Sequence, residues 1–256
     1  MKTRLSLLLM LILALNVRAK EEACQFNVRV ESTPKNLHSI AHNTNQLSRQ
    51  SYAILAALLA KIQCKLVTQP LPFPRALKML ESGTLNVISG MSKTQEREKF
   101  SYFIGPYHHE RIVVIGNRAL KNKANNLAQL LQLDGLISAT DGAYYGEQWL
   151  HALQTDPKLK GRIIYLSENQ KKFSMLFLNR VAISLEDERV VDEYLAKYDV
   201  GDKLVKLFIV HEDPVYFAFS KKAMSTALYE KLSRQWRHMV NSDELSNIKK
   251  NINSDH

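Results

Sequence analysis

The sequence has 256 residues, a formal charge of +10 at pH 7 and 45% hydrophobic residues. This length suffices for one large domain or two lobes, and the basic residues are scattered among acidic ones. Because nucleic-acid binding needs a clustered basic stripe or an aromatic stacking platform, we expect a solvated basic surface and no nucleic-acid partner. A mild preference for anionic ligands stays open.

The first 19 residues predict a secretory signal peptide. Lys2 and Arg4 precede an apolar run over 5–15, which is shorter than the roughly 20 residues needed to span a bilayer. Ala19 is a small residue that suits a cleavage site, so we expect a mature protein in the periplasm. Arg18 beside the cut is unusual, and an uncleaved anchor helix is the alternative.

Cys24 and Cys64 are the only cysteines of the sequence. In an exported chain, two cysteines are most simply explained by one disulfide bond, and two buried free thiols are the alternative. The residues before Cys24, "KEEAC", are charged and lack the small residues that lipid attachment requires. A bond over this loop would stabilise the fold by about 4 kcal/mol in the chain-entropy model.

Short β-branched or apolar runs alternate with helical patterns along the rest of the chain. Strands are predicted over 24–32, 64–69, 85–91, 111–118, 135–140, 162–167, 180–186, 203–210 and 215–222. Helices are predicted over 48–63, 73–83, 124–133, 144–153, 169–178, 187–197, 227–240 and 242–252. This alternation indicates an α/β architecture with mostly parallel sheets and helices on both faces.

Residues 80–107, "LESGTLNVISGMSKTQEREKFSYFIGPY", carry the most specific pattern of the chain. A helix that ends in glycine is followed by a short strand, a turn with glycine and serine, Thr-x-x-Arg, and Phe-Ser before Pro-Tyr. Two further stretches extend the pattern, "LFLNRVAISLEDERVVDEYL" over 176–195 and "VYFAFSKK" over 215–222. The chain thereby resembles the type II periplasmic binding proteins, specifically solute-binding family 3, which capture polar amino acids for ABC importers.

The resemblance implies two α/β lobes that are joined by two strands, with a ligand cleft between them. The implied division is a signal peptide at 1–19, first-lobe segments at 20–110 and 214–256, and a second lobe at 111–213. Cys24 and Cys64 would begin neighbouring parallel strands, which suits a disulfide. The resemblance further implies a monomer that hands its ligand to an ABC-transporter permease and needs no cofactor.

The resemblance also implies ligand-binding residues. Arg97, the arginine of Thr-x-x-Arg, would pair with the ligand's carboxylate, because guanidinium offers a planar fork for two hydrogen bonds; a surface arginine in a charged turn is the alternative. Asp187 would hold the ligand's α-ammonium, or only cap the helix that follows it. Further ligand contacts are implied for Phe73, Gly90, Ser92, Thr94, Gly142 and Tyr144, with core packing as the alternative for Phe73 and an ordinary turn for Gly142.

Two departures from the family pattern leave the ligand open. The segment 31–48, "ESTPKNLHSIAHNTNQLS", lacks the aromatic residue that usually follows the first strand, and the next helix has no early acidic residue. Glu31 could substitute as an acid in the cleft. We therefore make no prediction of the ligand's side chain.

Metal and catalytic functions find little support in the sequence. There is no Gly-x-Ser-x-Gly elbow and no phosphate loop. His38 and His42 have metal-compatible spacing if helical, but no third ligand is evident, so we expect no metal site. "HHE" over 108–110 falls at the implied hinge, where it predicts titratable hinge contacts.

Two other functions stay open beside import. One is a ligand-gated sensory or scaffold protein that works without a transporter. The other is an enzyme similar to cyclohexadienyl dehydratase, which has the same fold, and in which Glu31, Arg97 and Asp187 could imitate the site.

Overall fold

The computed structural model of the chain describes residues 24–31, 46–198 and 200–254. The strands are β1 Gln25–Val30, β2 Lys65–Pro70, β3 Val87–Ser92, β4 Ser101–Asn117, β5 Ile137–Ala139, β6 Ile163–Tyr165, β7 Ile183–Asp187 and β8 Leu204–Ser220. The helices are α3 Gln46–Ala60, α4 Phe73–Ser82, α5 Gln95–Glu98, η2 Arg118–Leu120, α6 Leu127–Leu131, α7 Glu147–Thr155, α8 Pro157–Arg162, α9 Asn169–Phe177, α10 Glu188–Tyr198, α11 Thr226–Asn241 and α12 Glu244–Ser254. The predicted signal peptide and the histidines His38 and His42 lie outside the described residues.

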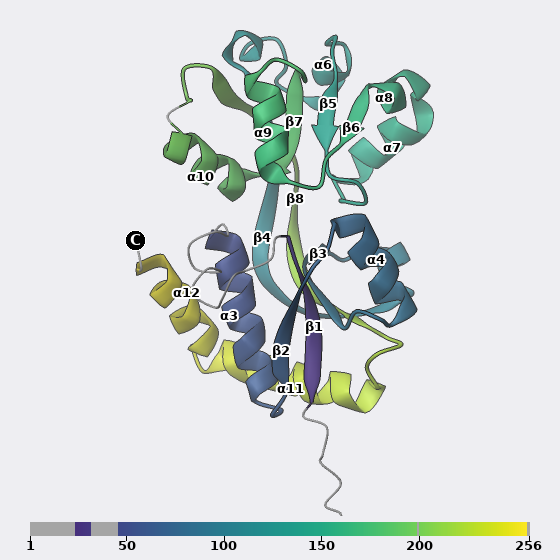
Figure 1. Cartoon of the computed structure of the whole chain (residues 1–256), viewed down its shortest axis with the longest axis vertical. Coiled ribbons are helices and arrows are strands. Elements are labelled where there is room, and N and C mark those ends of the chain that lie inside the picture. The colour runs from purple at the N-terminus through teal and green to yellow at the C-terminus, as the bar shows by residue number, and fades with distance from the viewer. Residues whose placement is uncertain (1–23, 32–45, 199, 255–256) are drawn as a thin grey trace, which may run out of the picture.

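Two α/β lobes are connected by the long strands β4 and β8 (Figure 1). The strand order is β2-β1-β3-β8-β4-β7-β5-β6. Pairs that lie wholly within one lobe, such as β1 with β2 and β5 with β6, are parallel, whereas β4 and β8 run antiparallel to each other and to their outer neighbours. The predicted two-lobed α/β fold with a two-strand hinge is thus confirmed, while the residue boundaries given for the lobes stay a prediction.

The crossing strands are longer than the hydrophobic pattern indicated. Segments 203–210 and 215–222 were expected as separate strands, but β8 runs through both as one strand of 17 residues. The intervening "HEDP" is polar and breaks the apolar pattern, yet it stays paired with β4 from His211 to Pro214. The polar stretch marks the place where the strand passes between the lobes, because no apolar core covers it there.

Helices cover both faces of the sheet in each lobe. In the first lobe, α3 and α11 bury one face through residues such as Leu55 and Trp236, and α4 buries the other through Leu80. Two further apolar clusters fill the second lobe, one under α7 and one under α9 and α10. The C-terminal helix α12 adds Leu245 and Ile248 to the cluster that contains α3, so the chain ends on the first lobe.

A disulfide bond joins Cys24 and Cys64, as the sequence predicted. The two residues precede the parallel neighbours β1 and β2, where Gln25 pairs with Lys65, and their Cα atoms lie 4.6 Å apart. The bond therefore ties together the starts of two adjacent strands. Among the described helices, none combines the length and the apolar character needed to cross a membrane.

Candidate functional site

The turn between β3 and β4 buries Arg97 against the second lobe. Thr94 has extended backbone and its Oγ1 accepts a hydrogen bond from the Arg97 backbone N–H at 3.3 Å, which caps the short helix α5. Only 8% of Arg97 is exposed. Its Nη1 donates to the Ser92 carbonyl oxygen at 2.9 Å, and its Nη2 donates to the Gly142 carbonyl oxygen at 3.0 Å. The structure thus brings four of the predicted residues together in one network that joins the lobes.

Gly142, in the loop after β5, permits this close approach of the lobes. Its φ is +75°, a value that glycine adopts freely. A Cβ at this position would lie 2.8 Å from Leu77 Cδ1 and 3.8 Å from Phe73 Cδ1, both in α4 of the first lobe. The guanidinium of Arg29 lies 5.7 Å from the centre of the Phe73 ring. Phe73 therefore stands at the junction of the lobes, next to the loop that contacts Arg97.

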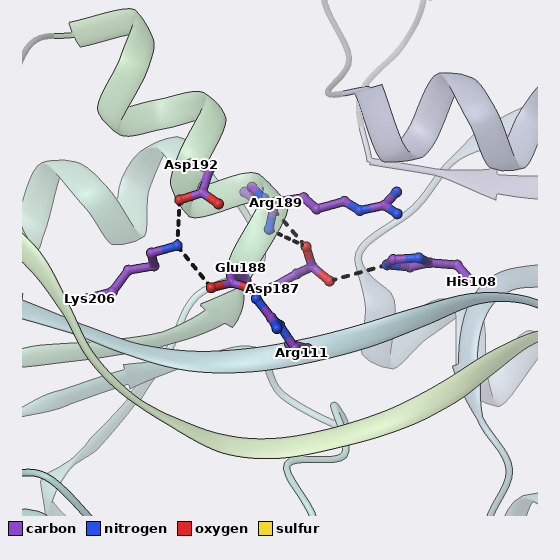
Figure 2. A network of polar contacts seen from close by, with 8 residues as sticks. His108, Arg111, Asp187, Glu188, Arg189, Asp192 and Lys206 are labelled. Carbon is purple, nitrogen blue, oxygen red and sulfur yellow. Dashed lines mark hydrogen bonds and ion pairs between the residues drawn. The ribbon is translucent and has the colours of Figure 1, made fainter. Parts of the chain in front are cut away.

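Asp187 ends β7 and caps α10 (Figure 2). Its Oδ1 accepts hydrogen bonds from the backbone N–H of Arg189 at 2.8 Å and of Val190 at 3.4 Å. Its Oδ2 has no hydrogen-bond partner among the described residues, and it faces His108 Nε2, equally unpartnered, at 4.0 Å. The two side chains are 5% and 7% exposed. The helix cap that the sequence allowed is thus present through Oδ1. Oδ2 is not used by the cap.

Burial shifts the pKa values of Asp187 and His108 in opposite directions. It raises the pKa of Asp187 to about 6, and the negative charge of Glu186 adds to the rise. Burial lowers the pKa of His108 to about 3, and the positive charge of Arg189 lowers it further, with Lys249 and His109 acting in the same direction. At pH 7 the histidine is therefore neutral and the aspartate carries most of its charge.

The two crossing strands present a titratable inner face. In the antiparallel register of β4 and β8, Glu110 lies directly opposite Asp213. His108 and His211 lie two pairs to either side and therefore on the same face. The outer face is exposed at residues such as Arg111. The "HHE" stretch therefore places His108 and Glu110 on the inner face, while His109 points the other way.

Glu110 is the carboxylate whose titration is most strongly perturbed by this arrangement. Burial raises its pKa to about 8, and the charges of Asp187, Glu186 and Asp213 raise it while Arg97 lowers it. Burial lowers the pKa of Arg97, and the interaction with Glu110 raises it. Glu110 thus links the two predicted ligand-binding residues electrostatically, from a strand that belongs to the hinge.

A buried ion pair supports the second-lobe wall of the site. Lys172 in α9 is 1% exposed; its Nζ pairs with Glu186 and donates to Thr140 Oγ1 at 2.9 Å. Burial alone would lower the pKa of Lys172, but Glu186 and Tyr145 raise it above its usual value. Glu186 precedes Asp187, and its Oε1 accepts a hydrogen bond from the Asp187 N–H at 3.0 Å.

The other predicted residues lie around this network rather than in it. Glu31 Oε1 accepts a hydrogen bond from the Asn169 N–H at 3.1 Å, so this first-lobe acid contacts the start of α9 across the gap. Tyr144 donates to Glu147 Oε1 at 2.7 Å and packs its ring against His211. Gly90, with φ +73°, lies beside the Tyr107 hydroxyl, 3.7 Å from where a Cβ would stand.

Sequence reasoning missed Lys172 and Asp213. Lys172 lies in "NQKKF", where nothing distinguishes the buried lysine from its exposed neighbour Lys171. Asp213 could have been found by alternation, since it shares a face with His211 once the polar stretch is assigned to a strand. In the described part of the chain, no three His, Cys, Asp or Glu side chains are arranged to hold a metal ion.

Comparison with known proteins places this geometry in context. Residues 31–253 match the sequence model of the bacterial extracellular solute-binding proteins, family 3, and no curated protein sequence matches the chain. A histidine kinase sensor domain with similarity to periplasmic binding proteins shares the fold with TM-score 0.69 and 10% identity, over 90% of this chain and 95% of that one.

Two binding proteins share the fold to a similar extent. An amino acid ABC transporter substrate-binding protein from Streptococcus pneumoniae, bound to L-arginine, has TM-score 0.67 and 18% identity over 89% of this chain and 94% of its own. An ancestral amino-acid-binding protein, a precursor of cyclohexadienyl dehydratase, has TM-score 0.65 and 18% identity over 89% and 93%. At these identities the structures establish the fold alone, whereas the family match covers most of the sequence. The chain belongs to the bacterial extracellular solute-binding proteins, family 3.

Proposed function

We propose that the protein captures a small polar, carboxylate-bearing ligand, an amino acid or a close relative, between its lobes in the periplasm and delivers it as a monomer to an ABC-type permease. The observation that carries this proposal is the pair of buried charges on opposite lobes, Arg97 and Asp187. Both side chains can form further hydrogen bonds. Arg97 has five N–H donors, and two hydrogen bonds join it to carbonyl oxygens. Asp187 Oδ2 has no partner among the described residues.

The geometry of an amino acid fits this pair. Its carboxylate and α-ammonium are a few ångströms apart, so one molecule could meet Arg97 and Asp187 only when the lobes are close together. Binding energy would then favour the closed arrangement, because only that arrangement gains both charge-assisted contacts. Side contacts are proposed from Phe73, Tyr144, Glu31 and the backbone or hydroxyl groups of Gly90, Ser92, Thr94 and Gly142.

A binding panel tests the proposal. The purified mature protein is titrated by calorimetry with the twenty amino acids, and thermal melts record stabilisation by each. We expect at least one amino acid to bind with micromolar or lower Kd and to raise the melting temperature, because a ligand that binds only the folded state stabilises it. Absence of binding across the panel would contradict the proposal.

An enzymatic function is the second candidate because of Glu110. A carboxyl group with a pKa of about 8 beside Arg97 still holds its proton at neutral pH, which is the state required of a general acid. Incubation with prephenate and with arogenate, followed by detection of an aromatic product, separates this function from simple binding. Product formation that Glu110→Gln abolishes would establish the enzyme.

The variant Asp187→Asn separates a ligand contact from a helix cap. Asparagine caps helices about as well as aspartate, so the unliganded protein should melt at nearly the wild-type temperature. Loss of the charge on Oδ2 should weaken amino-acid binding by about tenfold or more, since hydrogen bonds to charged groups contribute roughly 1.5–3 kcal/mol. Wild-type affinity in calorimetry would reduce Asp187 to a cap.

A further inference from the structure

Two acidic residues, Glu110 and Asp213, pair across the strands that cross between the lobes, and we call this pair the floor of the interlobe site. Glu110 of β4 and Asp213 of β8 are cross-strand neighbours, a placement in which two ionised carboxylates would repel each other. Asp213 has His211 Nε2 at 3.9 Å as its ion-pair candidate, but burial lowers the pKa of that histidine and keeps it neutral at pH 7. Within the described ranges, no lysine or arginine forms an ion pair with either carboxylate.

Within the described ranges, the cations near this floor make their contacts with other groups. Arg97 donates to two backbone carbonyl oxygens, and Lys172 pairs with Glu186. Arg111 adjoins Glu110 in sequence but lies on the outer face of β4, where it pairs with Glu188. The floor therefore has no ion-pair partner among the lysines and arginines of the described chain, and Arg97 acts on Glu110 only through its charge.

Asp187 and His108 contribute two further polar atoms on the face of the sheet that carries Glu110 and Asp213. Asp187 pairs with Ile112 of β4, the next inward residue after Glu110, so its carboxylate lies on the face that carries the floor. Its Oδ2 and the facing Nε2 of His108 are buried atoms without a hydrogen-bond partner among the described residues (Figure 2). Buried polar atoms nearly always have a partner, so these two buried atoms favour a ligand group as their partner.

We propose that Glu110 and Asp213 bind a cationic side-chain group of the ligand, so that the cleft selects basic amino acids over neutral ones of the same shape. This inference rests on the proposed function, in which Arg97 takes the carboxylate and Asp187 the α-ammonium. The second cation, an alkylammonium or a guanidinium, then lies between the cross-strand carboxyl groups and offsets the repulsion that arises when Glu110 ionises. A planar guanidinium offers enough N–H donors to reach both.

Proton release is a physical consequence of this arrangement. Glu110 holds a proton at pH 7 because of burial and of the charges of Asp187, Glu186 and Asp213, against which Arg97 acts. A ligand cation favours the ionised form, so it must displace that proton below about pH 8. Affinity for a basic amino acid should therefore rise between about pH 6.5 and pH 8.5, while affinity for a neutral one stays level.

L-Arginine and L-citrulline are the probes that test the proposal, because citrulline keeps the shape and lacks the positive charge. Calorimetry is performed with the wild type, with Glu110→Gln and with the matched control Glu212→Gln, which makes the same replacement on the exposed outer face of β8. We expect the wild type and the control to bind arginine at least about tenfold more tightly than citrulline. Glu110→Gln should lose this preference and bind citrulline as the wild type does.

The outcomes distinguish the inference from the proposed function. Equal binding of arginine and citrulline by the wild type, or a preference that persists in both Glu110→Gln and Asp213→Asn, overturns the inference. If neutral or acidic amino acids bind while arginine and lysine do not, the inference fails and the proposed function stands. If no amino acid binds, both fail. Thermal melts of each unliganded variant check that it is folded before its affinity is compared with that of the wild type.

Discussion

Replacing Arg97 with alanine is expected to weaken binding of any amino acid found in the panel by about 30-fold to several-thousand-fold. This range corresponds to a loss of roughly 2–5 kcal/mol for one partner of a desolvated charge pair. The side chain is 8% exposed and its guanidinium already spans the lobes from Ser92 to Gly142. Its removal would take away both the proposed carboxylate contact and a bond that holds the lobes together. Calorimetry with the identified ligand measures the loss.

Two companion variants make this result specific. Arg97→Lys keeps the charge but not the planar fork, so it should recover only part of the affinity. Arg162→Ala is the matched control, because Arg162 also donates to two backbone carbonyl oxygens, those of Gly135 and Leu131, but lies in α8 within the second lobe. An Arg97→Ala protein with the affinity of the Arg162→Ala protein would exclude Arg97 from the ligand site.

The sequence predicted the lobes well because their elements obey simple periodicities. Alternating β-branched runs became β1, β2, β3 and β7, and the proline and glycine at the ends of 73–83 did mark α4, with Gly83 at its C-cap. The short helices α5 and α8, of four and six residues, were missed, because one turn of helix has no apolar period to detect.

The candidate site was predictable only where one short motif builds it. Thr94 and Arg97 lie three residues apart, so their geometry is local and a capped turn fixes it. The contact between Arg97 and Gly142 spans 45 residues, and the pairing of Glu110 with Asp213 depends on the register of two long strands. No local pattern encodes these distances, and only the resemblance to a family pointed to Gly142.

The polar stretch of β8 explains why the sequence predicted two strands where the structure has one. A strand that leaves one core and enters another crosses a region where its side chains meet solvent or ligand. Residues from His211 to Pro214 are polar for that reason, while their backbone keeps its ladder to β4. The proposed floor of the site thus lies at the point where the strand prediction failed, as expected when function overrides the folding pattern.

Replacing Lys172 with methionine is expected to lower the free energy of unfolding by about 3–5 kcal/mol. Methionine fills a similar volume, so packing under α9 changes little, but Glu186 is left as a buried carboxylate without its cation. Breaking a buried pair from one side leaves a desolvated charge uncompensated, which accounts for this magnitude. Chemical denaturation followed by circular dichroism measures the change, and the pair Lys172→Met with Glu186→Gln should recover much of it.

Lys171→Met is the control for this prediction. Lys171 precedes Lys172 in α9, and its side chain is 63% exposed and pairs with Glu168 one turn earlier. Such a surface pair contributes about 0–1 kcal/mol, so its loss should be small. A small loss in both single variants would mean that Lys172 and Glu186 are not a compensating pair. A large loss that Glu186→Gln restores would show that the wall behind Asp187 depends on this neutralised charge, since the Glu186 carboxylate also receives the Asp187 N–H.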